Sequence, residues 1–112
     1  MEYWHNPRCS KSRQGLSLLE EKGVALTVRR YLDDPPSLAE LTALRAALDL
    51  PVLAMMRTRE ALFSELGLTR DSDDAALLAA MAAHPKLIER PVLIAGDRAV
   101  IGRPTERLLD LI

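Results

Sequence analysis

The first third of the chain alternates between strand-like and helix-like segments, and this alternation constrains the fold more than any other feature of the sequence. A short aromatic stretch over 2–5 favours a strand, and a helical pattern follows over about 10–22, with Gly23 placed to end it. The β-branched and apolar segment 24–31 favours a second strand. Strand, helix and strand in this order predict a right-handed βαβ unit whose two strands are parallel.

In the middle of the chain, apolar residues recur at the spacing of a helix. A run of aspartates and prolines ends the second strand, and Ser37 with Glu40 forms a capping-box pattern at the start of a helix. Short helical segments are predicted over 53–56 and 61–66. A longer one is predicted over 75–83, where preceding acidic residues suit a helix N-terminus. We therefore expect a block of helices after the second strand.

The last part of the chain returns to a strand period. Segments 91–95 and 98–102 flank Gly96-Asp97, which predicts a tight hairpin. Pro104 then takes the first position of a final helix that runs to about Leu111. Together the segments predict an α/β protein with a mixed four-stranded sheet and a helical block inserted in its middle.

Length and charge limit what such a chain does. Its 112 residues are enough for one cored domain over 1–112 and too few for two. No apolar run approaches the roughly 18 residues that span a bilayer, and segment 1–5 does not resemble a signal peptide, so we expect a cytoplasmic protein without membrane contact. The net charge of −1 provides no positive field for nucleic acid. We also expect a monomer, because no apolar stripe indicates a partner copy.

Cys9 is the only cysteine, so the chain forms neither an internal disulfide nor a multi-thiolate metal site. It lies directly before the first predicted helix, whose free amide hydrogens favour an anion, as do the nearby cations Arg8, Lys11 and Arg13. We therefore expect this thiol to be partly ionised at neutral pH. A small cysteine buried in the core is the alternative, and the polar neighbours disfavour it.

Two further side chains lie close enough in sequence to act on the Cys9 sulfur. His5 could stabilise the thiolate or orient an oxyanion, or could be an ordinary, partly buried histidine at a strand end. Ser12 could cap the first helix, donate its hydroxyl to the sulfur, or do both. Neither His5 nor His84 has the spacing of a metal ligand, so no metal site is expected.

Three arginines stand at boundaries between predicted elements, where a bound oxyanion would explain them. Arg103 takes the N-cap position of the last helix, which normally favours Ser, Thr, Asp or Asn. Arg90 directly precedes a strand, and Arg57 follows the apolar pair Met55-Met56. Composition alone favours a solvated surface residue for each of the three, and their placement at element boundaries is what favours an oxyanion site.

Three segments, HNPRCSKSR over 5–13, IERPV over 88–92 and IGRPT over 101–105, together resemble the ArsC-type, glutaredoxin-dependent arsenate reductase family. The resemblance extends over essentially the whole chain. It implies a thioredoxin-like fold with a helical insertion, a cis proline at Pro91, and Cys9 as the nucleophile. It also implies that the oxyanion is held by Arg57, Arg90 and Arg103, and that the thiolate is assisted by His5 and Ser12.

The implied reaction is the reduction of arsenate through a thiol–arsenate adduct on Cys9, without a bound cofactor. Because the chain lacks a second cysteine, glutathione or an equivalent thiol would be the co-substrate and glutaredoxin would clear the mixed disulfide.

The cysteine segment is also similar to that of Spx-like regulators, so a non-catalytic protein that binds RNA polymerase or another protein is one alternative. Arg8, Ser10 and Lys11 differ from the residues around the cysteine in the best-characterised reductases. A thiol-dependent oxidoreductase with another oxyanion or a glutathionylated substrate is therefore a third hypothesis.

Overall fold

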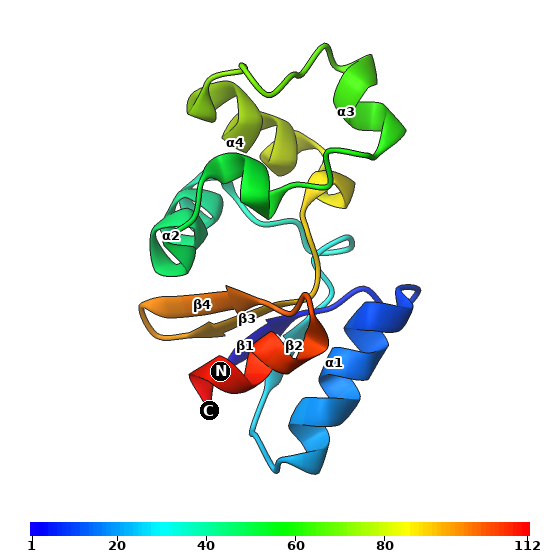
Figure 1. Ribbon diagram of the computed structural model, residues 1–112, viewed down its shortest axis with the longest axis vertical. Helices are drawn as coiled ribbons and strands as arrows, with labels where there is room; N and C mark the ends of the chain where they lie inside the picture. The colour runs from blue at the N-terminus through cyan, green and yellow to red at the C-terminus, as the bar shows by residue number, and fades with distance from the viewer.

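A four-stranded mixed sheet organises the chain in the computed structural model, which describes residues 1–112 (Figure 1). The strand order is β2-β1-β3-β4. The first two strands pair in parallel, and the remaining pairs are antiparallel, so the predicted βαβ unit and hairpin are both present. The strands are β1 (Glu2–Trp4), β2 (Thr27–Arg29), β3 (Val92–Ala95) and β4 (Arg98–Ile101).

Helices cover both faces of this sheet (Figure 1). One face carries α1 and the 3₁₀ helix η3, and the other carries an insertion between β2 and β3 that holds all the remaining helices, as the sequence predicts. No helix is both long enough and apolar enough to cross a membrane. The helices are α1 (Ser10–Glu21), α2 (Leu38–Leu48), η1 (Val52–Met55), α3 (Ala61–Glu65), α4 (Asp74–Ala83), η2 (Pro85–Leu87) and η3 (Thr105–Leu111).

The sheet separates two apolar cores, because successive side chains of a strand point to opposite faces. On the side of the insertion, Trp4 and Val92 belong to a cluster of 14 buried residues that includes side chains from α2, η1 and α4. The smaller cluster on the other side joins the sheet to α1 and η3. It consists of Tyr3, Leu19, Leu93 and Leu108.

Arg29, at the end of β2, ties the insertion to the sheet. Its guanidinium group forms ion pairs with Glu40 in the first turn of α2 and, at 3.3 Å, with Asp34. It also lies 5.5 Å from the centroid of the Trp4 ring. Hydrogen bonding to Arg29 lowers the pKa of Glu40 to about 2. The first helix of the insertion is therefore anchored by charge as well as by apolar packing.

The second strand is shorter than the sequence predicts. A strand over 24–31 was expected, and β2 spans only Thr27–Arg29. The backbone N–H of Val24 donates back into α1, and the carbonyl of Arg30 accepts hydrogen bonds from the turn that follows. The helix end and the turn thus use the backbone groups that a longer strand would need.

The prediction for the final helix is wrong in two respects. The element is the 3₁₀ helix η3, and Pro104 is its N-cap, with φ −63° and ψ 164°, instead of its first helical residue. The N–H of Arg107 donates to the carbonyl of Pro104 at 3.0 Å, which is the spacing of a 3₁₀ turn. Arg103 therefore precedes the cap and does not occupy it. The Arg90–Pro91 bond is cis, as the resemblance implies, and so is Arg103–Pro104.

Helix α1 packs closely against the sheet and η3 at Gly15. A Cβ atom at this position would lie 2.5 Å from the phenolic oxygen of Tyr3 and 2.8 Å from Cδ1 of Leu108. The Tyr3 hydroxyl is itself held in place, because it donates to the carbonyl of Ser12 at 2.6 Å. The position of α1 on the sheet thus depends on the absence of a side chain at Gly15.

We predict that Gly15→Ala lowers the free energy of unfolding by about 1–2 kcal/mol. The methyl group forces Tyr3 or Leu108 to move, which outweighs the gain of up to ~1 kcal/mol from replacing a helical glycine. Urea denaturation followed by circular dichroism measures the change. Ser17→Ala, on the exposed face of the same helix, is the control and should stay within about 0.5 kcal/mol of the wild type. An undiminished stability of Gly15→Ala would contradict the close approach.

Candidate active site

The Cys9 sulfur lies at the N-terminal end of α1. Cys9 is the N-cap residue of this helix, with φ −94° and ψ 121°, and its side chain is partly exposed. Cys9 makes no side-chain capping hydrogen bond, but the backbone N–H groups of Lys11 and Ser12 lie near enough to lower the pKa of its thiol. These amides belong to the first turn, where no partner within the helix is available to them. The helix therefore presents free donors to an anionic sulfur, as the sequence predicts.

Opposing effects set the pKa of the Cys9 thiol. Burial raises it, because desolvation disfavours the thiolate, whereas the Ser12 and Lys11 amides and the charge of Arg90 lower it. Together the lowering effects exceed the effect of burial, so the pKa of the thiol lies below the ordinary value of a cysteine. Arg103 approaches as well, with its Nη2 atom 3.9 Å from the sulfur. The strongest charge effect on the sulfur, that of Arg90, thus comes from a residue far away in the sequence.

His5 and Ser12 form a buried pair beneath the loop that carries Cys9. The exposed fraction is 7% for His5 and 0% for Ser12. The Nδ1 atom of His5 lies 2.7 Å from Oγ of Ser12, and this Oγ also accepts the N–H of Asn6 at 2.9 Å. Ser12 therefore acts on the sulfur through its backbone amide, and its hydroxyl is engaged elsewhere. Burial and the charges of Arg30 and Arg13 lower the pKa of His5, which favours a neutral ring that accepts the Ser12 hydroxyl hydrogen.

The three arginines singled out in the sequence line one polar cavity of about 370 Å³. Two short segments that pair in antiparallel fashion bring them together, with Met56 opposite Ile88. The N–H of Arg57 donates to the carbonyl of Leu87 at 2.8 Å, and the neighbouring bond from Glu89 to Met55 measures 2.7 Å. The insertion and the start of β3 thus form a common wall. Arg57, Arg90 and Arg103 line the cavity together with a fourth arginine, Arg59.

Two glutamates that the sequence analysis did not identify hold these arginines. An Oε1 atom of Glu89 lies 3.1 Å from Nη1 of Arg90 and 3.2 Å from Nε of Arg103. Glu60 pairs with Arg57 at 3.3 Å. The Nε atom of Arg90 is buried and has no hydrogen-bond partner in the protein. Proximity in sequence could have indicated both glutamates, since Glu89 adjoins Arg90 and Glu60 follows Arg57 by three positions.

Tyr31 is a further side chain near the site that the sequence analysis missed. It is 1% exposed, and burial raises its pKa to about 12, although the charges of Arg90 and Arg57 oppose the rise. The phenol therefore keeps its proton, and it lies close enough to Cys9 and Asn6 to interact with both. Tyr31 follows β2 as the Cys9 loop follows β1. The carboxyl ends of parallel strands lie at the same edge of a sheet, and this rule could have indicated that Tyr31 lies near Cys9.

The site offers a thiol of lowered pKa beside several guanidinium groups, with neutral hydrogen-bonding side chains behind it. Nowhere in the chain do three or more His, Cys, Asp or Glu side chains gather closely enough to hold a metal ion. A thiolate is a strong nucleophile, and guanidinium groups bind the oxygens of a tetrahedral anion in pairs. The arrangement is suited to attack by Cys9 on an oxyanion.

We predict that the rate of Cys9 alkylation by iodoacetamide rises with pH along a curve whose midpoint lies below the ordinary cysteine pKa of 9.0. Arg90→Ala removes a charge that lowers this pKa, so its midpoint should move up and its rate near neutral pH should fall. Arg98→Ala is the control, because Arg98 is an exposed arginine of β4 without an ion pair. Equal midpoints for Arg90→Ala and the wild type would show that Arg90 does not act on the sulfur.

Known proteins resemble this chain over nearly its whole length. A model of the ArsC family matches residues 4–111. An arsenate reductase of Neisseria meningitidis is 49% identical over 96% of this chain and 94% of its own. A solved arsenate reductase from Vibrio cholerae has a TM-score of 0.95 at 48% identity and covers 100% of this chain and 98% of its own. A putative arsenate reductase from Yersinia pestis has a TM-score of 0.91 at 44% identity, with 97% of each chain covered. These likenesses confirm the thioredoxin-like fold with its helical insertion.

Proposed function

This chain belongs to the ArsC family, and on that premise we propose that it is an arsenate reductase whose nucleophile is Cys9. One observation carries the proposal. The Cys9 thiol, whose pKa Arg90 helps to lower, lies 3.9 Å from Arg103, and both arginines line a polar cavity together with Arg57. Relatives named arsenate reductase that are 43% and 49% identical support the choice of arsenate.

In the first step the Cys9 thiolate attacks the arsenic atom of singly charged arsenate. A sulfur–arsenic bond forms, one arsenic–oxygen bond breaks, and the departing hydroxide takes a proton from solvent to become water. The guanidinium groups of Arg57, Arg90 and Arg103 stabilise the charge on the arsenate oxygens through paired hydrogen bonds.

The second step requires an external thiol, because Cys9 is the only cysteine. We infer that glutathione or an equivalent thiolate attacks the Cys9 sulfur of the adduct. A disulfide forms between the two sulfurs, the sulfur–arsenic bond breaks, and its electron pair stays on arsenic, which is thereby reduced from the +5 to the +3 state. Arsenite leaves after protonation by solvent. A glutaredoxin thiolate then removes the glutathione from Cys9 by exchange, and no bound cofactor takes part.

We predict that Cys9→Ser abolishes arsenite formation, because a serine hydroxyl is not ionised near neutral pH and cannot form the mixed disulfide. Arg103→Ala should raise the KM for arsenate about tenfold to hundredfold, the effect of losing one hydrogen bond to a charged group. Arsenite is measured directly, and Arg98→Ala should behave as the wild type. Arsenite production by Cys9→Ser would overturn the proposed nucleophile.

The electron donor is tested by following NADPH oxidation with glutathione, glutathione reductase and glutaredoxin, with and without arsenate. We expect oxidation to depend on arsenate. Without glutaredoxin, turnover should slow after about one equivalent of arsenite, and the intact mass should show one glutathione on Cys9. Oxidation that needs a glutathionylated substrate in place of arsenate would favour a related oxidoreductase. Capture of RNA polymerase by a protein inactive with every oxyanion would favour an Spx-like regulator.

A further inference from the structure

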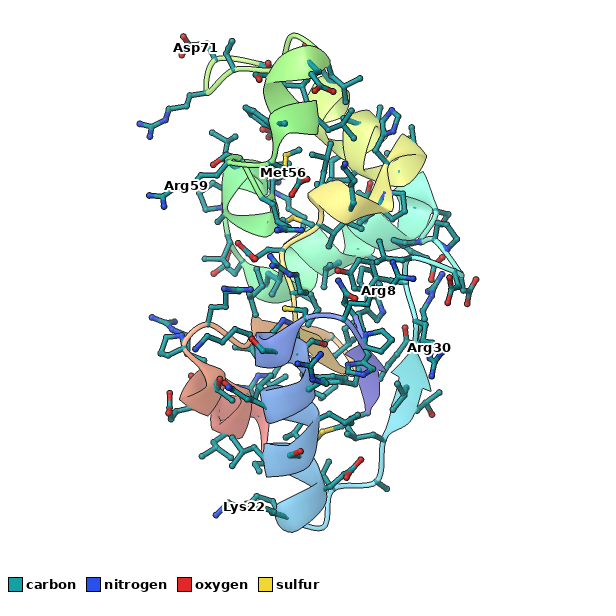
Figure 2. The ribbon with its side chains drawn as sticks, turned by 90° about the vertical axis from the view of Figure 1, so that its right-hand side faces the viewer. Arg8, Lys22, Arg30, Met56, Arg59 and Asp71 are labelled. Atoms are coloured by element: carbon teal, nitrogen blue, oxygen red, sulfur yellow. The ribbon has the colours of Figure 1, made fainter.

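Arg59 differs from the other arginines of the polar cavity. Two glutamates form ion pairs with the inner three, whereas Arg59 takes part in no ion pair or side-chain hydrogen bond, although it too lines the cavity. Its side chain is exposed, and Figure 2 shows it extending from the helical insertion into solvent. A guanidinium group without a partner at the rim of a polar cavity is placed to capture an anion that arrives from solution.

The charge of the cavity is suited to a second anion beside the oxyanion. Four arginines and two glutamates line it, which leaves two positive charges in excess. In the proposed reaction a singly charged adduct replaces the thiolate on Cys9, so one negative charge takes the place of another. The excess positive charge is therefore present when the second substrate arrives, and it favours a thiol that carries a carboxylate over an uncharged thiol.

The size and lining of the cavity also exceed what arsenate alone requires. Its volume of about 370 Å³ falls within the range of roughly 300–1,000 Å³ that holds small organic ligands, whereas arsenate is a single tetrahedral ion. Thr58 adds an exposed hydroxyl next to Arg59, and Met56 is the only apolar side chain of the lining. A polar, carboxylate-bearing molecule therefore matches this wall better than an apolar one.

We propose that Arg59 binds a carboxylate of the incoming thiol and thereby selects an acidic low-molecular-weight thiol, such as glutathione, over an uncharged one. The inference rests on the proposed function, since it concerns the thiol that attacks the Cys9 adduct. In that step the carboxylate stays on Arg59 while the thiolate forms the disulfide with the Cys9 sulfur. Arg57, Arg90 and Arg103 remain with the oxyanion.

The kinetic test compares glutathione with 2-mercaptoethanol, an uncharged thiol, by direct measurement of arsenite. Arg59→Ala should lower the ratio of kcat/KM for glutathione to kcat/KM for 2-mercaptoethanol about tenfold, as expected for one lost contact between opposite charges. Arg59→Lys should restore much of the ratio, because the positive charge is kept. Arg98→Ala, an exposed arginine outside the cavity, should leave it unchanged. An unchanged ratio in Arg59→Ala would overturn the inference.

A second measurement needs no arsenate and so separates this inference from the proposed function. S-methylglutathione, which cannot react, is titrated into the protein, and binding is followed by NMR shifts of the 56–60 amides. The wild type should bind it several-fold more tightly than Arg59→Ala, and raised salt should weaken the binding. Such binding would support the thiol site even in a protein inactive with arsenate. Equal binding by both proteins, or none, would reject the site even if arsenate reduction is found.

Discussion

The candidate site depends on the effect of the first-turn amides of α1 on the Cys9 sulfur, whose pKa they lower. Burial alone would keep the thiol protonated, so the amides and nearby guanidinium groups must together outweigh desolvation. The amides act from a fixed position because α1 lies against the sheet at Gly15 and the Tyr3 hydroxyl holds the carbonyl of Ser12. The apolar core beneath the helix thus determines where the anion-binding donors point.

The insertion helps to bring the arginines of the cavity together. Pairing between Met56 and Ile88 joins the chain that leaves η1 to the chain that enters β3, and the arginines beside this pairing line one cavity. Arg29 anchors the other end of the insertion through Glu40. The helical block therefore does more than cover one face of the sheet. It supplies the guanidinium groups of Arg57 and Arg59 and part of the wall of the site.

Charge balance explains how so many arginines lie together before an oxyanion binds. Glu89 forms ion pairs with both Arg90 and Arg103, and Glu60 pairs with Arg57, so mutual repulsion among the guanidinium groups is offset. The carboxylates also restrict the side-chain freedom of the arginines, which lowers the entropy lost when an anion is bound. Arg59 lies outside this balance, and the same physical reasoning gives it a different role from the other three.

The sequence by itself determined the features that depend on hydrogen bonds between near neighbours. The capping box of Ser37, the left-handed Gly23 after α1, the hairpin at Gly96 and the placement of Cys9 before a helix were all predicted correctly, because local backbone groups specify them. The length of β2, the 3₁₀ form of η3 and the contacts of Glu89 and Tyr31 were decided only in the tertiary structure. Each depends on which distant segments pack together, as in the approach of Arg103 to a sulfur 94 residues away. Local periodicity carries no information about such contacts, because packing sets them only after the elements have formed.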